Sequence, residues 1–158
     1  MPTLRKSRRS VEDQVRTELK EIRAQVAGVR GSLVATSDGL VVAHDIPDVE
    51  PTQIAALAAA TLAVARRATL ATECGTFREA VARGSDGYLA VYAASDSAIV
   101  AVVGTSSLNV GMLQYRAREI IERIAAHSSQ IGALAAPVTA AESARPSRSL
   151  PRRRPATS

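Results

Sequence analysis

Apolar residues recur at helical spacing on either side of the middle of the chain. Toward the N-terminus they follow one another at intervals of three and four: Val11, Val15, Leu19, Ile22 and Val26. This spacing predicts an amphipathic helix that is capped by Ser10 and closed by Gly28. Toward the C-terminus a second stripe consists of Leu113, Ala117, Ile120 and Ile124. It predicts a last helix that begins around Ser107 or Leu108 and ends near His127.

The longest helical pattern covers residues 51–73, a stretch rich in alanine and free of charge up to residue 65. At about 100° per residue its bulky side chains share one arc: Ile54, Leu57, Thr61, Val64 and Ala68. Small side chains share the opposite arc, which leads toward Arg67 and Leu70: Ala56, Ala59, Ala60 and Ala63. A surface helix needs only one apolar face. We therefore expect the bulky arc to cover a sheet of this chain and the small arc to contact a second helix.

Short runs of strand-forming residues predict five strands, at residues 32–36, 40–44, 76–83, 88–93 and 98–103. The first two strands are joined by a Ser-Asp-Gly turn and should form a hairpin. Three charged side chains in the third strand are typical of an exposed edge. The fifth run is apolar on both sides, so we expect it at the centre of the sheet, covered on both faces. The order α-β-β-α-β-β-β-α predicts an α+β sandwich, a five-stranded antiparallel sheet with helices on both faces.

The net charge of +5 comes from the two ends of the chain. Residues 1–10 hold four basic residues and no acid, and residues 129–158 hold five arginines and one glutamate, so the ends together carry +8. Between them, 11 basic and 14 acidic residues give a net charge of −3. An acidic central region argues against a specific nucleic-acid-binding domain. The basic ends favour at most a weak, salt-dependent contact with an anionic surface.

We divide the chain into a disordered basic N-terminus (residues 1–9), one folded domain (10–128) and a disordered tail rich in Pro, Ser and Arg (129–158). The single cysteine, Cys74, cannot form an internal disulfide, and we find no signal-peptide pattern. The charge-free run of the alanine-rich helix is shorter than the ~20 residues of a membrane span. We therefore expect a cytoplasmic protein, with peripheral attachment to a membrane as the alternative.

Candidate catalytic and metal-binding residues are scarce in this sequence. It contains neither a phosphate-binding G-x-x-x-x-G-K-[ST] loop nor a G-x-S-x-G nucleophile motif. His44 and His127 have no Cys or His at metal-ligand spacing, and we interpret both as structural. Arg66 and Arg67 are candidates for an arginine finger, but such a residue normally comes from a mobile loop, and these two lie in a helix. We predict no catalytic residue, no metal and no cofactor.

Four segments in this order resemble the Roadblock/LC7 family, in particular its bacterial, small-GTPase-associated type. They are VRGSLVATSDGLVVA at 29–43, the alanine-rich helix, GSDGYL at 84–89 and LNVG at 108–111. The similarity covers roughly residues 10–128. It implies a homodimer with paired central helices and a sheet that continues into the second copy through the third strand. Together with the small arc, it gives this expected interface: Ala56, Ala59, Ala60, Ala63, Arg67, Leu70, Phe77, Glu79 and Val81.

The resemblance also implies a function. Bacterial members of the family bind Ras-like small GTPases, so we expect a signalling module that activates or recruits such a GTPase and is not itself an enzyme. Two alternatives remain, a small-ligand sensor and a general protein-interaction module without GTPase regulation. A sensor needs a roomy pocket with a few polar groups, and an alanine-rich core offers little space for one.

Overall fold

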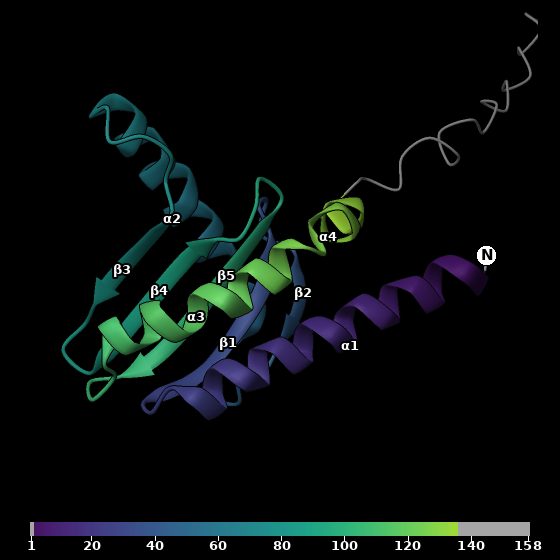
Figure 1. Cartoon of the computed structure of the whole chain (residues 1–158), viewed down its shortest axis with the longest axis horizontal. Coiled ribbons are helices and arrows are strands. Elements are labelled where there is room, and N and C mark those ends of the chain that lie inside the picture. Colours follow the sequence, from purple (N-terminus) through teal and green to yellow (C-terminus); the bar gives the residue numbers. More distant parts are fainter. Residues whose placement is uncertain (1, 136–158) are drawn as a thin grey trace, which may run out of the picture.

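Four helices and five strands make up residues 2–135, the part of the chain that the computed structural model describes (Figure 1). In chain order they are α1 (Pro2–Gln25), β1 (Val29–Thr36), β2 (Val41–His44), α2 (Pro51–Ala71), β3 (Glu79–Arg83), β4 (Gly87–Ala93), β5 (Ala98–Thr105), α3 (Val110–Ala125) and α4 (Ser128–Ala135). The predicted order of elements and the α+β class are confirmed, and α4 is added at the end.

The five strands form one antiparallel sheet in the order β2-β1-β5-β4-β3. β5 lies in the middle, where Ala101 pairs with Leu33 of β1 and Val100 pairs with Tyr92 of β4. This is the central position that its uninterrupted apolar sequence predicted. The two edges are β2 on one side and β3 on the other.

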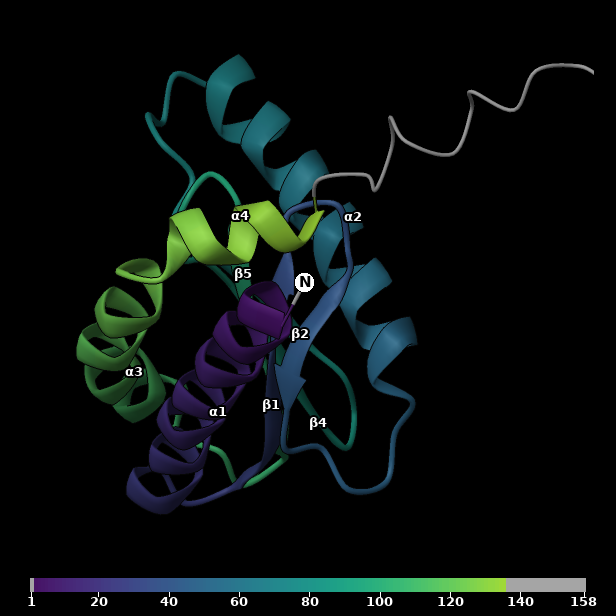
Figure 2. The ribbon, with the colours of Figure 1, turned by 90° about the vertical axis from the view of Figure 1, so that its right-hand side faces the viewer.

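Helices cover both faces of the sheet (Figures 1 and 2). α1, α3 and α4 share one face with a core that includes Val100 and Val102 of β5. α2 covers the other face, where Ile99 and Ala101 of the same strand point. All four β5 side chains are fully buried. The sheet therefore separates two apolar cores, and the alternation of side chains along β5 supplies both of them.

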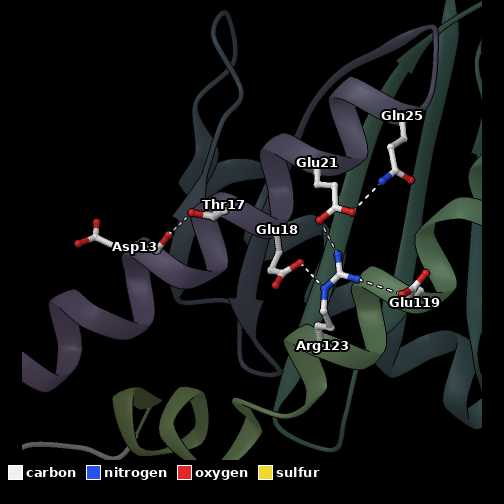
Figure 3. Close-up of polar contacts among 7 residues, drawn as sticks. All are labelled: Asp13, Thr17, Glu18, Glu21, Gln25, Glu119 and Arg123. Carbon is white, nitrogen blue, oxygen red and sulfur yellow. Dashed lines mark hydrogen bonds and ion pairs between the residues drawn. The ribbon is translucent and has the colours of Figure 1, made fainter.

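An arginine on α3 joins the two long helices that share a face (Figure 3). Arg123 Nε lies 2.7 Å from Glu18 Oε2 and Arg123 Nη2 lies 2.5 Å from Glu21 Oε2, both on α1. Glu119, one turn earlier on α3, approaches Arg123 Nη1 at 3.5 Å. The hydrogen bond that Arg123 donates to the Glu18 carboxylate is the main reason that the pKa of Arg123 lies above its usual value. The acidic side of α1 is thereby turned toward α3.

The first helix begins earlier than predicted. α1 starts at Pro2, so residues 2–9, which we expected to be disordered, are helical. Pro2 suits a first helical turn, because the N–H that proline lacks would have no partner there. Arg8 Nε pairs with Glu12 Oε1 one turn later at 3.0 Å, and this pair favours helix across the expected boundary. Residues 5–10 are exposed, so this part of α1 extends past the sheet (Figure 1).

The folded part also continues beyond residue 128, where we expected the domain to end. α4 packs against α1 and β1, and its Ile131 is fully buried among the residues of that core. Ser97 Oγ in the β4–β5 turn donates to the carbonyl oxygen of Ser128 at 2.9 Å. The apolar contacts of Ile131 and Leu134, together with this hydrogen bond, therefore hold the first residues of the predicted tail. Residues 136–158 of that tail lie outside the described residues.

We predict that Ile131→Ala lowers the free energy of unfolding by about 2 kcal/mol, because the truncation leaves a cavity beneath α4 that the backbone cannot fully close. Urea denaturation of the full chain measures this change. Ser129→Ala, which alters an exposed neighbour on the same helix, is the control and should change the value by less than about 0.5 kcal/mol. Equal stability of the two variants would contradict the packing of α4.

Candidate functional site

α2 lies close to the sheet because two of its residues that face the sheet, Ala55 and Ala58, are small. It is capped by Glu50, whose carboxylate accepts from Thr52 N at 3.4 Å. Gly39, in the β1–β2 turn, has a φ of +92°, and a Cβ added there would lie 3.4 Å from Ala56 Cα and from Ala59 Cβ. A larger residue at the turn would therefore crowd the helix. This close approach fixes which side of α2 faces outward.

The prediction that the bulky arc of α2 covers the sheet is wrong. Leu57 and Val64 are 51% and 70% exposed. The sheet is contacted instead by Ala55, Ala58 and Leu62, which are buried. Because Ala55 and Ala58 are small, α2 packs closely on the sheet with these residues facing it. Leu57 and Val64 therefore point outward. By length and composition α2 would also suit a membrane span, but these three buried residues place one of its sides against the sheet.

Most residues of the expected interface lie on the outside of the molecule. On α2 the exposed ones are Ala56, Ala60, Ala63, Arg67 and Leu70, the last of them 79% exposed. Ala59 is half-buried beside Gly39. On β3, Glu79 is exposed and Val81 is 38% exposed. Phe77 is only 7% exposed and packs in the core beneath α2, so it supports this surface from below.

β3 presents an open edge of the sheet. The carbonyl of Arg78 accepts from Ala93 N at 2.9 Å, and Gly84 N donates to Gly87 O at 2.8 Å. Even-numbered residues of this segment therefore turn their backbone toward β4, and odd-numbered residues turn theirs outward. The outward row of N–H and C=O groups belongs to Glu79, Val81 and Arg83. Such a row is a template for a further strand.

α2 packs against β3, so the exposed face of the helix adjoins this edge. We call the two together the α2–β3 surface: Ala56, Leu57, Ala60, Ala63, Val64, Arg67, Leu70, Glu79 and Val81. Four of its members are large apolar side chains exposed to solvent: Leu57, Val64, Leu70 and Val81. Three of them lie on α2, and Val81 lies at the sheet edge with its side chain on the face opposite α2. Exposed apolar side chains mark interaction sites where they gather. Leu57 and Val64 were missed because the sequence pattern assigned them to the opposite side of the helix.

A hollow of about 540 Å³ lies at the C-terminal end of α2, and its lining includes Arg66 and Phe77. Arg66 Nη2 donates to the carbonyl oxygen of Ser95 at 3.2 Å. This bond ties α2 to the β4–β5 turn. Of the two candidate finger arginines, Arg66 is thus half-buried and anchored, and Arg67 is exposed on the α2–β3 surface.

A second hollow, of about 350 Å³, lies between α3 and the strands β3 and β4. Tyr92 lines it; this residue is 4% exposed, and its hydroxyl has no hydrogen-bond partner among the described residues. Burial, together with the negative charge of Glu79, raises the pKa of Tyr92 well above its usual value, so the hydroxyl stays protonated. Gln114 of α3 donates to the Glu79 carboxylate beside it. No sequence pattern indicated this hollow, because Tyr92 follows the ordinary alternation of side chains along β4.

Comparison with models of known protein families identifies the family to which this chain belongs. The model of the Roadblock/LC7 domain matches residues 17–104, more than half of the chain. The chain belongs to the Roadblock/LC7 domain family. The match begins within α1 and ends in β5, so the basic N-terminal part of α1 lies outside it, as do α3 and α4. The expected family is confirmed.

Relatives of this Roadblock/LC7 domain occur in archaea and bacteria. Two uncharacterized proteins of Methanocaldococcus jannaschii are 28% and 27% identical to it over 115 residues, which are 72% of this chain and 96% of each relative. A Roadblock/LC7 domain from Streptomyces avermitilis superposes with a TM-score of 0.67 at 19% identity, covering 71% of this chain and 95% of that one. The gliding protein MglB from Thermus thermophilus gives 0.69 at 20% identity, covering 76% and 92%. At these identities the two structures show a common fold.

Proposed function

We propose that this Roadblock/LC7 domain is a homodimeric, cytoplasmic signalling module that binds a Ras-like small GTPase and either activates or recruits it. The observation that carries the proposal is the α2–β3 surface, an apolar helix face beside an open sheet edge, in a chain of this family. MglB and MglC are among the proteins that share the fold, and one MglB structure is described as a tetrameric arrangement. Self-association of a similar fold supports the dimer proposed for this chain.

The helix part of the surface suits contact with an identical helix. Ala56, Ala60 and Ala63 leave little side-chain bulk between two helices, and Leu57 and Val64 flank them. Burying these exposed side chains stabilises association by roughly 25 cal/mol per Å² of apolar area. The two-fold symmetry of a homodimer places the same patch on both partners.

The strand part of the surface is complementary to itself. Glu79, Val81 and Arg83 share the α3 side of the sheet, because their β4 partners Tyr92 and Tyr88 pack in that core. If two β3 strands pair antiparallel about a two-fold axis at Val81, Glu79 of each copy faces Arg83 of the other. The outward N–H and C=O groups of the same residues then pair across the junction. Moving the axis to Glu79 or to Arg83 would place like charges opposite each other, which is unfavourable.

The proposed role toward the GTPase is non-catalytic. Ras-like GTPases reorder their switch segments when the γ-phosphate is present, so a rigid surface that fits one arrangement binds that nucleotide state better. The second copy occupies the α2–β3 surface in this proposal. The GTPase therefore contacts either the face that carries α1 and α3 or the groove between the paired α2 helices.

A small-ligand sensor is the second candidate function, and the hollow beside Tyr92 is the observation in its favour. A volume of about 350 Å³ and an unpartnered hydroxyl fit a small polar molecule. The hollow borders Glu79, so a ligand bound there would contact the strand that we assign to the dimer. Family membership gives this candidate less support than it gives the GTPase module.

We predict that Ala63→Glu converts the dimer into a monomer, because pairing the helices would bury a carboxylate without a partner at a cost of several kcal/mol. Light scattering of the full chain measures the mass. Ala24→Glu makes the same change on the exposed side of α1 and should leave the dimer intact. A dimer of unchanged stability in Ala63→Glu would place the interface elsewhere.

We predict that Glu79→Arg and Arg83→Glu each weaken the dimer about tenfold, because either change places like charges opposite each other twice in the assembly. The double variant Glu79→Arg/Arg83→Glu restores opposite charges and should recover most of the affinity. Sedimentation equilibrium gives the dissociation constants. If the double variant dimerises no better than the single ones, the register about Val81 is wrong, whereas the Ala63→Glu experiment still tests the dimer itself.

We predict that the full chain binds a Ras-like GTPase encoded beside it with at least tenfold preference for one nucleotide state. Calorimetric titration with the GDP form and with a non-hydrolysable GTP form measures the preference. In hydrolysis assays Arg67→Ala should retain any stimulation, and Arg66→Ala should act only through stability, since Arg66 is tied to Ser95. Equal affinity for both states would leave scaffolding alone, and loss of stimulation in an Arg67→Ala protein that still binds would make Arg67 a catalytic residue.

A further inference from the structure

Five basic residues form a stripe along one side of α1. They are Arg5, Arg9, Arg16, Lys20 and Arg23, and all five are exposed. At about 100° per residue they fall within an arc of roughly 60°, over a length of about 27 Å. Within residues 2–135, none of the five has a carboxylate within ion-pair distance. We call this set the α1 basic stripe.

The α1 basic stripe lies on the side of α1 that faces away from α3. Glu18 and Glu21 lie on the opposite flank of the helix, where both contact Arg123 (Figure 3). Of the acids nearer the stripe, Glu12 pairs with Arg8, and Asp13 lies at its border. The helix therefore has an acidic flank used within the fold and a basic flank open to solvent.

Further positive charge lies at the same end of the molecule. The N-terminal end of α1 adds Lys6 and Arg8, both exposed. Along the sequence, residues 136–158, which lie outside the described residues, contain five arginines and one glutamate. The remainder of the protein, residues 11–128, is acidic even with the three stripe residues that it contains. Within the described residues, exposed positive charge is therefore concentrated along α1 and at its N-terminal end.

We propose that the α1 basic stripe attaches this protein to the surface of an anionic lipid bilayer. Each basic side chain held near such a surface strengthens binding about fivefold, and clusters of four to eight are typical of helices that bind acidic lipids. α1 contains no aromatic side chain on which a nucleic-acid base could stack. A flat surface can touch one side of the molecule alone, whereas a long nucleic acid would extend past the stripe toward the acidic parts.

The attachment does not depend on the proposed GTPase role. α1 packs on β1 and β2, at the edge of the sheet opposite β3. A second copy on the α2–β3 surface would therefore leave the stripe accessible. The family model begins at residue 17, so Arg5, Arg9 and Arg16 lie in a part of α1 outside the family match.

Sedimentation of the full chain with phosphatidylcholine vesicles, with and without phosphatidylglycerol, tests the proposal. We expect binding that requires phosphatidylglycerol, weakens steeply with added salt and falls at least tenfold in Arg16→Glu/Lys20→Glu/Arg23→Glu. The control Arg78→Glu/Arg116→Glu/Arg118→Glu makes the same change in net charge at exposed positions away from the stripe. The control should lose no more than about threefold.

Each other outcome contradicts a defined part of the proposal. Equal losses in the two triple variants would show that net charge, and not the stripe, controls binding. Tighter binding to duplex DNA than to vesicles at equal phosphate concentration, abolished by the stripe variant, would make nucleic acid the partner. If the stripe variant loses its circular-dichroism spectrum, the neutral variant Arg16→Gln/Lys20→Gln/Arg23→Gln replaces it, and unchanged vesicle binding by that folded protein would overturn the proposal.

Discussion

The central strand must be covered on both faces, and the remaining elements are arranged around that requirement. Val100 and Val102 of β5 point to one side of the sheet and Ile99 and Ala101 to the other, all fully buried. Exposing either row to water would forfeit roughly 25 cal/mol for each Å² of apolar area. Helices therefore lie on both faces. Within residues 2–135, three helices share one face and α2 alone covers the other, so the coverage is thinnest at α2.

Thin coverage explains the exposed face of α2. A single helix over a twisted sheet covers most area when its axis lies close, and Ala55 and Ala58 permit that approach. The larger side chains Leu57 and Val64 then have no sheet beneath them and point outward. An apolar patch of this kind is costly for a monomer and favourable for an assembly. The packing of Ala55 and Ala58 against the sheet thus stabilises the fold and also exposes the apolar side chains of the α2–β3 surface.

The sequence predicted the elements whose pattern is local, and its errors arise where tertiary contacts decide. The central place of β5 follows from its uninterrupted apolar run, and the open edge at β3 follows from its charges. The prediction of which side of α2 contacts the sheet was wrong. Helical periodicity shows which side chains share a face of the helix, but not how closely that face approaches the sheet. α4 was missed because it is short: Ile131 is buried and Leu134 is partly buried, and two apolar positions are too few for a recognisable period. The hollow beside Tyr92 depends on how α3 lies over β4, which no local pattern encodes.

The positions of the two surfaces permit both to be used at once. α2 and β3 lie on one face and at one edge of the sheet, whereas α1 lies on the other face, over the strands farthest from β3. The ion pairs of Arg123 with Glu18 and Glu21 hold the acidic flank of α1 inward and so keep its basic flank outward. A partner bound to the helix face and sheet edge would neither cover nor neutralise the stripe. The proposed dimerisation and the proposed membrane attachment therefore use separate surfaces, and a change in one can be measured without disturbing the other.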